Sequence, residues 1–293
     1  MTVEELINSV SNQFAEANLF FGHGTDNPWD EAVALVLTVL KLPDSTDVLN
    51  RAVDEPLVQE VRRLATRRID TRQPLAYLLG KTQYAGLEFA VEPGVIVPRS
   101  PLGLLFGDIA PWLPDRVACI VDACAGSGAI GIVAAHAFPD AQVHLLEMDD
   151  AALALAQRNV QRHNLQSRVH VHACDVTQPW PEAVDNVDLA LANPPYVSAS
   201  DMRNLPPEYT HEPKLALAAG ESGLDVITGI FTQLRHRIAS HGLLVGEVGL
   251  SDEALQKAYP DVPFIWPELT HGGEGVFLLE AEHLNSHTLA LPN

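Results

Sequence analysis

The sequence predicts an α/β protein with a mostly parallel, doubly wound sheet, preceded by a small helical domain. From Val117 onward, short apolar runs alternate with segments of helical periodicity, a pattern typical of parallel βαβ units. Before Gly80, apolar residues recur only at helical spacing. We therefore expect a helical domain at residues 1–80, a β-hairpin linker at 81–98 and an α/β domain at 99–293.

The first 80 residues are expected to form three helices. Apolar positions recur at helical spacing from Leu6 to Ala17, Pro28-Trp29 opens a second helix that ends near Leu40, and a third runs from about Pro56 to Ile69. The last part of this domain carries the basic cluster Arg62, Arg63, Arg67, Arg68 and Arg72. This cluster is interpreted either as a solvated helix face or as a contact for RNA or an acidic partner.

The linker and the α/β domain follow from shorter patterns. Residues 82–84 and 87–91 are expected to pair as a hairpin across Ala85-Gly86, and an amphipathic segment ends near Trp112. Strands are expected at 117–121, 143–146, 169–173, 187–192 and 243–248, and helices at 129–138, 150–163 and 227–238. The apolar pieces 264–266 and 276–279 are expected to close the sheet with an antiparallel strand.

Charge and cysteine content exclude several classes of protein. The formal net charge of −20 argues against a partner held through nucleic-acid phosphates and favours a basic macromolecule. Three cysteines without CxxC spacing fit reduced thiols, and the acidic N-terminus lacks the features of a signal peptide, so we expect a cytoplasmic protein. We expect no membrane association, because the apolar stretch 32–40 is too short to cross a bilayer. The twelve histidines show no ligand spacing, and we expect no metal.

A glycine-rich turn indicates a nucleotide site. Residues 126–131 satisfy G-x-G-x-x-G after a predicted strand, and Glu147 ends the next strand about 20 residues later. The small residues permit close approach of a ligand to the backbone, and the carboxylate suits ribose hydroxyls. Glycines at such a turn can also serve packing alone.

Three carboxylates distinguish between possible nucleotides. Asp122, Glu147 and Asp175 follow or end successive predicted strands, with no Lys or Arg among them. A pyrophosphate would be poorly placed beside Asp122, whereas an ammonium or sulfonium would be stabilised there. Asp175 could accept a hydrogen bond from an adenine amino group, or it could only cap a turn. S-adenosylmethionine fits this set, and a nicotinamide-dependent oxidoreductase is the alternative.

The fourth strand ends in Asn193-Pro194-Pro195-Tyr196. Because proline cannot continue a central strand, the Asn193 amide should lie at the carboxyl edge of the sheet, where open α/β folds bind ligands. Its amide offers one acceptor and two donors, which suits recognition of a planar amide or amino group. Asn-Pro-Pro could also be a simple turn.

With these motifs in this order, the chain resembles the class I S-adenosylmethionine-dependent methyltransferases, which have a Rossmann-like, mostly parallel seven-stranded sheet. More narrowly, it resembles the N5-glutamine methyltransferases that modify release factors and a ribosomal protein. The similarity covers nearly the whole chain and includes residues 77–80, 122–128, 193–196, 246–249 and 272–277. Segments 97–101 and 205–213 are similar to the branch that acts on large-subunit ribosomal protein L-three. The chain departs from the family at Leu104, where a Glu is usual, and at Cys124 and Ala125, where Gly and Thr types are commoner.

The resemblance implies a site and a mechanism. The Asn193 side-chain oxygen and the Pro194 carbonyl would each accept an N–H of a substrate glutamine, while Pro195 and Tyr196 would enclose the amide plane. The residues implied to bind S-adenosylmethionine are Asp122, Cys124, Ala125, Gly126, Ser127, Gly128, Glu147, Asp175, Val176 and Asn193. Arg99 and Glu212 lie in family-like segments, but they could equally be a loop anchor and a surface charge.

The most specific reading of the sequence is methylation of a glutamine side-chain amide in a basic ribosomal protein, with L-three favoured. A release-factor methyltransferase is the nearest alternative. An adenine-N6 methyltransferase is disfavoured because a DNA-binding enzyme usually carries a basic surface, and we expect no direct DNA binding. A non-catalytic ribosome-assembly protein that retains the fold is the remaining alternative.

Overall fold

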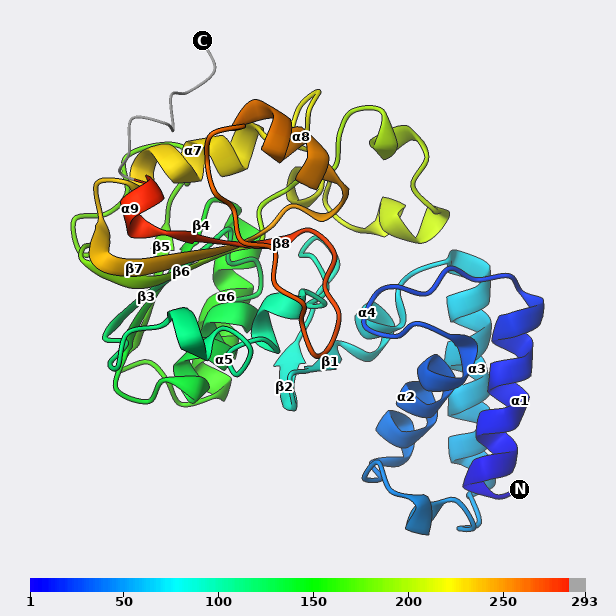
Figure 1. Cartoon of the computed structure of the whole chain (residues 1–293). Coiled ribbons are helices and arrows are strands. Elements are labelled where there is room, and N and C mark those ends of the chain that lie inside the picture. The colour runs from blue at the N-terminus through cyan, green and yellow to red at the C-terminus, as the bar shows by residue number, and fades with distance from the viewer. Residues whose placement is uncertain (285–293) are drawn as a thin grey trace.

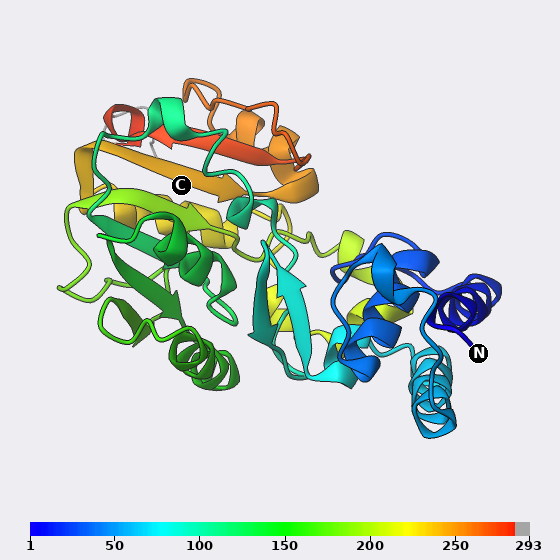
Figure 2. The same ribbon diagram turned by 90° about the horizontal axis from the view of Figure 1, so that it is seen from below.

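The computed structural model describes residues 1–284 (Figure 1). An N-terminal group of helices lies beside an α/β domain, and a two-stranded hairpin lies between them (Figures 1 and 2). Residues 285–293 of the expected third domain lie outside the described residues. Within residues 1–284, none of the helices combines the length and apolar character needed to span a bilayer.

The helical domain consists of α1 Val3–Glu16, α2 Pro28–Leu40, α3 Glu55–Thr71 and α4 Leu75–Leu79. Local sequence explains where two of them begin: Thr2 and Glu5 form a capping box for α1, and the Asn27 side chain accepts from the N–H of Asp30 at the start of α2. The three longer helices confirm the expected elements. The five-residue α4 was not predicted, because it is too short to show helical periodicity.

The arginine cluster of α3 is only partly a solvated face. Arg62, Arg63 and Arg67 are exposed, as that interpretation requires. Arg68 is 1% exposed, and Arg72 beyond the helix end is half-buried against the α/β domain. The interpretation was therefore wrong for Arg68 and Arg72, whose partner, Glu208, is distant in sequence.

The predicted hairpin forms from β1 Lys81–Tyr84 and β2 Leu87–Ala90. Ala85 and Gly86 both have positive φ, as the tightest hairpin turns require. The fully buried Asn159 accepts from the Ala90 N–H at 2.9 Å and donates to the Ser127 carbonyl at 2.9 Å. One side chain therefore ties the hairpin to the glycine-rich turn.

The central sheet has six strands in the order β5-β4-β3-β6-β7-β8, parallel except for β8. This confirms the doubly wound arrangement and the antiparallel closing strand. The strands are β3 Cys119–Ala123, β4 Gln142–Glu147, β5 Val169–Ala173, β6 Val187–Ala192, β7 Ile238–Glu247 and β8 Val276–Glu280.

The expected seventh strand is not formed within residues 1–284. In its place, Ile265 makes a single antiparallel bridge to Leu278. Pro263 and Pro267 flank this position and lack the N–H groups that a longer ladder would need. The sheet therefore has six strands and a bridge rather than seven strands.

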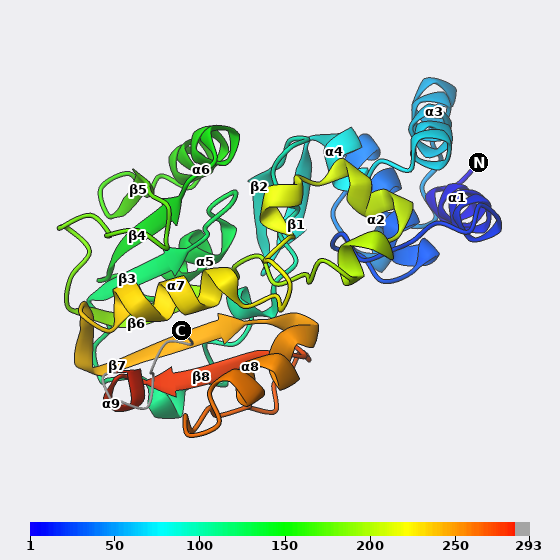
Figure 3. The same ribbon diagram turned by 90° about the horizontal axis from the view of Figure 1, so that it is seen from above.

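Helices cover both faces of the sheet (Figures 1 and 3). The helices are α5 Ala129–Ala137, α6 Asp150–Arg162, α7 Asp225–Leu234, α8 Asp252–Ala258 and α9 Ala281–Leu284. Ile120 faces the core beneath α5, whereas its neighbour Val121 faces the core beneath α7, as alternation along a strand requires.

Two local expectations need correction. The helix expected at 227–238 ends at Leu234, because Ile238 already begins β7. The segment expected to be amphipathic up to Trp112 contains only the 3-10 turns Pro101–Gly103 and Ala110–Trp112, where prolines interrupt a regular helix. Helix α8 was not predicted.

Replacing Gly246 by Ala should destabilise the α/β domain. A Cβ there would lie 2.4 Å from the ring of the fully buried Phe277. Overpacking of this kind costs about 1–3 kcal/mol, which urea denaturation would measure. Gly107→Ala is the control, because a Cβ at Gly107 would meet no atom within 4 Å. Equal stabilities of the two variants would contradict this packing.

Candidate active site

A cavity of about 490 Å³ lies at the carboxyl ends of the parallel strands. The glycine-rich turn after β3, the end of β4 and the Asn193–Tyr196 segment after β6 line it. Residues 94–100 and parts of segment 205–218 complete the lining. The structure therefore brings both predicted motifs to one cavity, at the edge where open α/β sheets bind ligands.

The turn between β3 and α5 has a tight left-handed course. Cys124, Gly126 and Gly128 have φ values of 63°, 55° and 79°. Cys124, Ala125, Gly126 and Ser127 line the cavity, but Gly128 does not. A Cβ on Gly128 would lie 3.0 Å from Leu145, so this glycine serves packing against the sheet.

Glu147 lies at the end of β4 and lines the cavity. One carboxylate oxygen accepts from the N–H of Gly126 at 2.8 Å, and the other accepts from the N–H groups of Met148 and Asp149 at 2.8 and 2.9 Å. These bonds fix the carboxylate beside the turn. Each oxygen can accept more than one hydrogen bond, so the group can also receive ribose hydroxyls.

Asp175 and Val176 follow β5 and also line the cavity. Asp175 Oδ1 accepts from the N–H and the hydroxyl of Thr177 at 2.9 and 2.7 Å, which is the turn role considered from sequence. Within residues 1–284 its Oδ2 accepts no hydrogen bond. That oxygen can still receive an amino group, so the two roles are compatible.

Asp122 does not reach the cavity surface. The prediction placed it at a strand end, but β3 continues through Ala123 and the Asp122 side chain is fully buried. Its Oδ2 accepts from the Gly131 N–H at 2.8 Å, while Oδ1 has no hydrogen-bond partner up to residue 284. Burial raises the pKa of this carboxyl to about 7. The hydrogen bond from Gly131 to Asp122 therefore ties the start of α5 to β3.

The Asn193–Tyr196 motif leaves polar atoms open to the cavity. Strand β6 ends at Ala192, and the half-buried Asn193 side chain has no hydrogen-bond partner within residues 1–284. The buried Pro194 also has a carbonyl that receives no hydrogen bond from this part of the chain. The Tyr196 hydroxyl donates to Glu247 Oε1 at 3.0 Å. Burial raises the pKa of Tyr196, so its hydroxyl stays neutral.

Glu247 is a cavity residue that the sequence interpretation missed. It ends β7, is 7% exposed, and accepts from the Ser100 hydroxyl at 2.5 Å as well as from Tyr196. Burial raises its pKa above the usual value. A signal was present, because Glu247 lies within the family-like segment 246–249.

Arg99 lines the cavity, and Glu212 holds it from behind the lining. The Arg99 guanidinium donates to both oxygens of Glu212 at 2.6 and 2.8 Å and lies over the Tyr209 ring. Burial alone would raise the pKa of Glu212, but His23 and Arg99 hold it at about 2. The alternative of a surface charge was wrong for Glu212, which is 4% exposed.

Leu104 and one group of potential metal ligands lie outside the cavity lining. Leu104, the departure from the usual Glu, is exposed and does not line it. Three potential metal ligands gather near the end of the described chain, at Glu280, Glu282 and His283, also away from the cavity. The expectation of a metal-free reaction stays a prediction.

Comparisons with known proteins agree with this geometry. A family model described as "Methyltransferase small domain" matches residues 109–213. The ribosomal protein uL3 glutamine methyltransferase of Francisella tularensis is 37% identical over 97% of this chain and 91% of that protein. The protein of the same name from Bordetella pertussis is 38% identical over 97% of both chains. This chain belongs to the uL3 glutamine methyltransferase family.

Family membership confirms the resemblance recognised in the motifs and the class I methyltransferase fold. The crystal structure of the hMettl16 catalytic domain in complex with MAT2A 3′UTR hairpin 6 has a TM-score of 0.53. It is 15% identical and covers 83% of this chain and 90% of that chain. At this identity the likeness concerns the fold alone.

Asp122→Asn should flatten the pH dependence of stability. Because the pKa of Asp122 is raised, the folded protein binds more protons than the unfolded chain between about pH 4 and pH 7. The contribution of Asp122 to the free energy of unfolding therefore falls as the pH rises through this window. Between pH 5 and pH 7, the free energy of unfolding measured in urea should fall on the order of 2 kcal/mol more in wild type than in the variant. Asp140→Asn, an exposed carboxylate before β4, should keep the wild-type slope.

Proposed function

We propose that this protein transfers a methyl group from S-adenosylmethionine to the side-chain amide nitrogen (N5) of a glutamine in ribosomal protein uL3. The observation that carries the proposal is the Asn193 side chain, which lines the cavity without a hydrogen-bond partner within residues 1–284. Membership of the uL3 glutamine methyltransferase family supports the choice of substrate.

The fit of the cofactor rests on the donor and acceptor set of the cavity. Glu147 offers a fixed carboxylate for ribose hydroxyls, and Asp175 Oδ2 offers an acceptor for an adenine amino group. The backbone of Gly126 leaves space that a side chain would reduce, since a Cβ would lie 3.3 Å from Ile96. We propose that Cys124, Ala125, Ser127, Val176 and Asn193 complete this surface. Gly128 and Asp122 would support it through contacts behind the cavity lining.

The chain's residues would act by positioning the acceptor nitrogen. S-adenosylmethionine supplies the electrophilic methyl group when bound. An amide nitrogen is a poor nucleophile, because its lone pair is delocalised into the carbonyl. The Asn193 oxygen and the Pro194 carbonyl would each accept a substrate N–H, which directs the nitrogen and stabilises positive charge growing on it. Such alignment can contribute roughly 7–11 kcal/mol.

The protein side of the site needs no general base in this scheme, because the amide proton can leave after transfer. Pro195 and Tyr196 would enclose the amide plane, and the bond from Tyr196 to Glu247 would hold the ring in place. We propose these four motif residues as the substrate site, with Asn193 and Pro194 as the catalytic pair.

The substrate class agrees with the charge of the chain. A protein with a formal net charge of −20 attracts a basic partner at long range, as a ribosomal protein would be. We propose that the reaction takes place in the cytoplasm. We also propose that residues 1–80, 81–98 and 99–293 act as a helical domain, a hairpin linker and a methyltransferase domain.

Asn193→Ala should reduce glutamine transfer to a trace while S-adenosylmethionine still binds. Losing one such preorganised hydrogen bond lowers turnover by about 10²–10³-fold. The assay incubates enzyme and labelled S-adenosylmethionine with a ribosomal extract and identifies the labelled protein and residue by mass spectrometry. Asn204→Ala is the control, because among residues 1–284 its side-chain amide bonds only to the nearby Ser200 carbonyl.

Label on a uL3 glutamine would support the proposal. Label on a release factor would move the protein to the neighbouring branch, and label on DNA would replace the substrate class. Near-normal glutamine methylation by Asn193→Ala would refute the role of the motif.

Glu147→Ala should weaken cofactor binding rather than turnover of bound substrate. Hydrogen bonds to a charged group contribute about 1.5–3 kcal/mol, so the dissociation constant for S-adenosylmethionine should rise at least roughly tenfold by calorimetry. Asp140→Ala removes an exposed carboxylate before the same strand and should leave the constant unchanged. An unchanged constant in Glu147→Ala would remove Glu147 from the proposed site.

A further inference from the structure

Segment 205–213 lies between the catalytic cavity and the helical domain. It leaves the sheet after the Asn193–Tyr196 motif and forms the 3-10 turn Pro207–His211. Figures 1 and 3 show this yellow-green stretch beside α4 and the chain between α1 and α2. His211 contacts the Thr71 carbonyl at 2.8 Å, at the end of α3.

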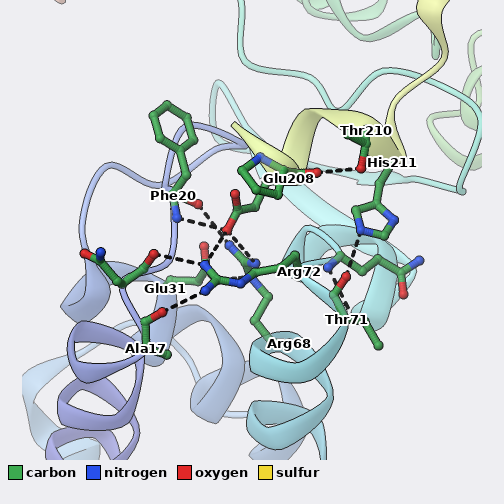
Figure 4. Close-up of polar contacts among 12 residues, drawn as sticks. Ala17, Phe20, Glu31, Arg68, Thr71, Arg72, Glu208, Thr210 and His211 are labelled. Carbon is green, nitrogen blue, oxygen red and sulfur yellow. Dashed lines mark hydrogen bonds and ion pairs between the residues drawn. The ribbon is translucent and has the colours of Figure 1, made fainter. Parts of the chain in front are cut away.

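Glu208 is the centre of the contact between the two domains (Figure 4). Its side chain is fully buried, and Oε1 accepts from the Phe20 N–H at 3.0 Å and from Arg72 Nη1 at 3.3 Å. Arg68 Nη1 lies 3.7 Å from the same oxygen. Burial alone would raise the pKa of Glu208, but the Phe20 N–H and the two arginines lower it, so the group is a carboxylate at neutral pH.

Hydrogen bonds within the helical domain also hold Arg68. Its Nε donates to Glu31 Oε1 at 2.6 Å and its Nη2 donates to the Phe20 carbonyl at 3.0 Å. Glu31 is 3% exposed and Arg68 1% exposed. The helical domain therefore fixes the arginine, and the arginine faces Glu208.

A buried ionic network of this kind contributes little net stability to the contact between two domains, because its charges must be desolvated. Desolvation costs several kcal/mol per buried ion, and apolar residues of similar volume often stabilise as well or better. The network is also incompletely satisfied, because Arg68 Nη1 and Glu208 Oε2 lack hydrogen-bond partners in the described part of the chain. Each unsatisfied buried group costs about 1–3 kcal/mol. The network thus fixes the relative positions of its side chains, although its burial costs free energy of folding.

Tyr209, the residue after Glu208, connects the network to the cavity. Tyr209 lines the cavity and packs against Phe20 and His23 of the helical domain, with ring centroids 5.6 and 4.7 Å apart. The Arg99 guanidinium lies 5.5 Å from the centroid of the Tyr209 ring. Glu212, one turn later, holds the same guanidinium with both oxygens.

From Arg99 the contacts continue to the motif. The next residue, Ser100, donates to Glu247, and Glu247 accepts from the Tyr196 hydroxyl. A continuous series of packed and hydrogen-bonded groups therefore runs from Arg68 in α3 to Tyr196. Continuity alone does not establish coupling, so the series needs a test that separates position from stability.

We propose that Arg68 and Glu208 are positioning residues for the protein substrate: the helical domain, through this buried network, fixes the Tyr209–Arg99 wall against which the glutamine-bearing segment binds. The proposal rests on the proposed function, in which the glutamine amide is held at Asn193. Within residues 1–284, the side chains of Glu147 and Asp175 make no hydrogen bond to the network, so binding of S-adenosylmethionine should depend on it little.

The decisive variant is Glu208→Gln, which keeps the shape and removes the charge. The KM for the uL3 substrate should rise about tenfold, as expected for a lost charged hydrogen bond, while the dissociation constant for S-adenosylmethionine stays within a factor of about two. Glu60→Gln is the matched control, because Glu60 also pairs with an α3 arginine, Arg63, but in solvent. An unchanged KM in folded Glu208→Gln would overturn the proposal, as would an equal loss of cofactor affinity.

A second measurement needs no substrate. Hydrogen exchange of peptide 205–213 should be faster in Glu208→Gln than in wild type and unchanged in Glu60→Gln. Absence of glutamine transfer by wild type would refute the proposed function alone, whereas unchanged exchange would refute the positioning role alone. If Glu208→Gln fails to fold, Arg72→Met serves instead, because Arg72 is a partly exposed donor to Glu208 and should shift both readouts in the same direction by less.

Discussion

The site depends on the point at which β6 leaves the sheet. Ala192 still pairs with Gly246 of β7, but Pro194 and Pro195 have no N–H to continue that ladder. The chain therefore turns away one residue after the strand, and the Asn193 amide is left at the sheet edge without a partner among residues 1–284. The other segments that line the cavity leave this group accessible to a ligand.

The two ends of the cavity are stabilised by different means. Beside the glycine-rich turn, backbone N–H groups hold Glu147, so the geometry follows from the strand and turn themselves. In the wall that contains Arg99, side chains from distant segments hold one another, since the Arg99 guanidinium donates to Glu212. Local sequence therefore specifies the first part of the cavity, whereas contacts between segments far apart in the sequence specify the second.

That division explains how much the sequence could predict. Helix α2 and strand β6 carry local signals, an Asn-Pro cap and an apolar run ending in Pro-Pro, and both were predicted correctly. The burial of Arg68 was not, because its partners Glu31 and Glu208 are both far from it in the sequence and no local pattern encodes those contacts. Asp122 was misplaced because β3 runs to Ala123, beyond the point at which the sequence pattern ends it.

The contact between Phe20 and Glu208 joins residues separated by 188 positions, nearly two thirds of the chain. Residues 205–213 therefore pack against the helical domain, although the chain reaches them only after four strands of the central sheet. A chimera that exchanges the first 80 residues keeps Glu208 paired only if the incoming domain supplies donors equivalent to the Phe20 N–H, Arg68 and Arg72. Two segments far apart in the sequence must therefore match each other for the two domains to fit together.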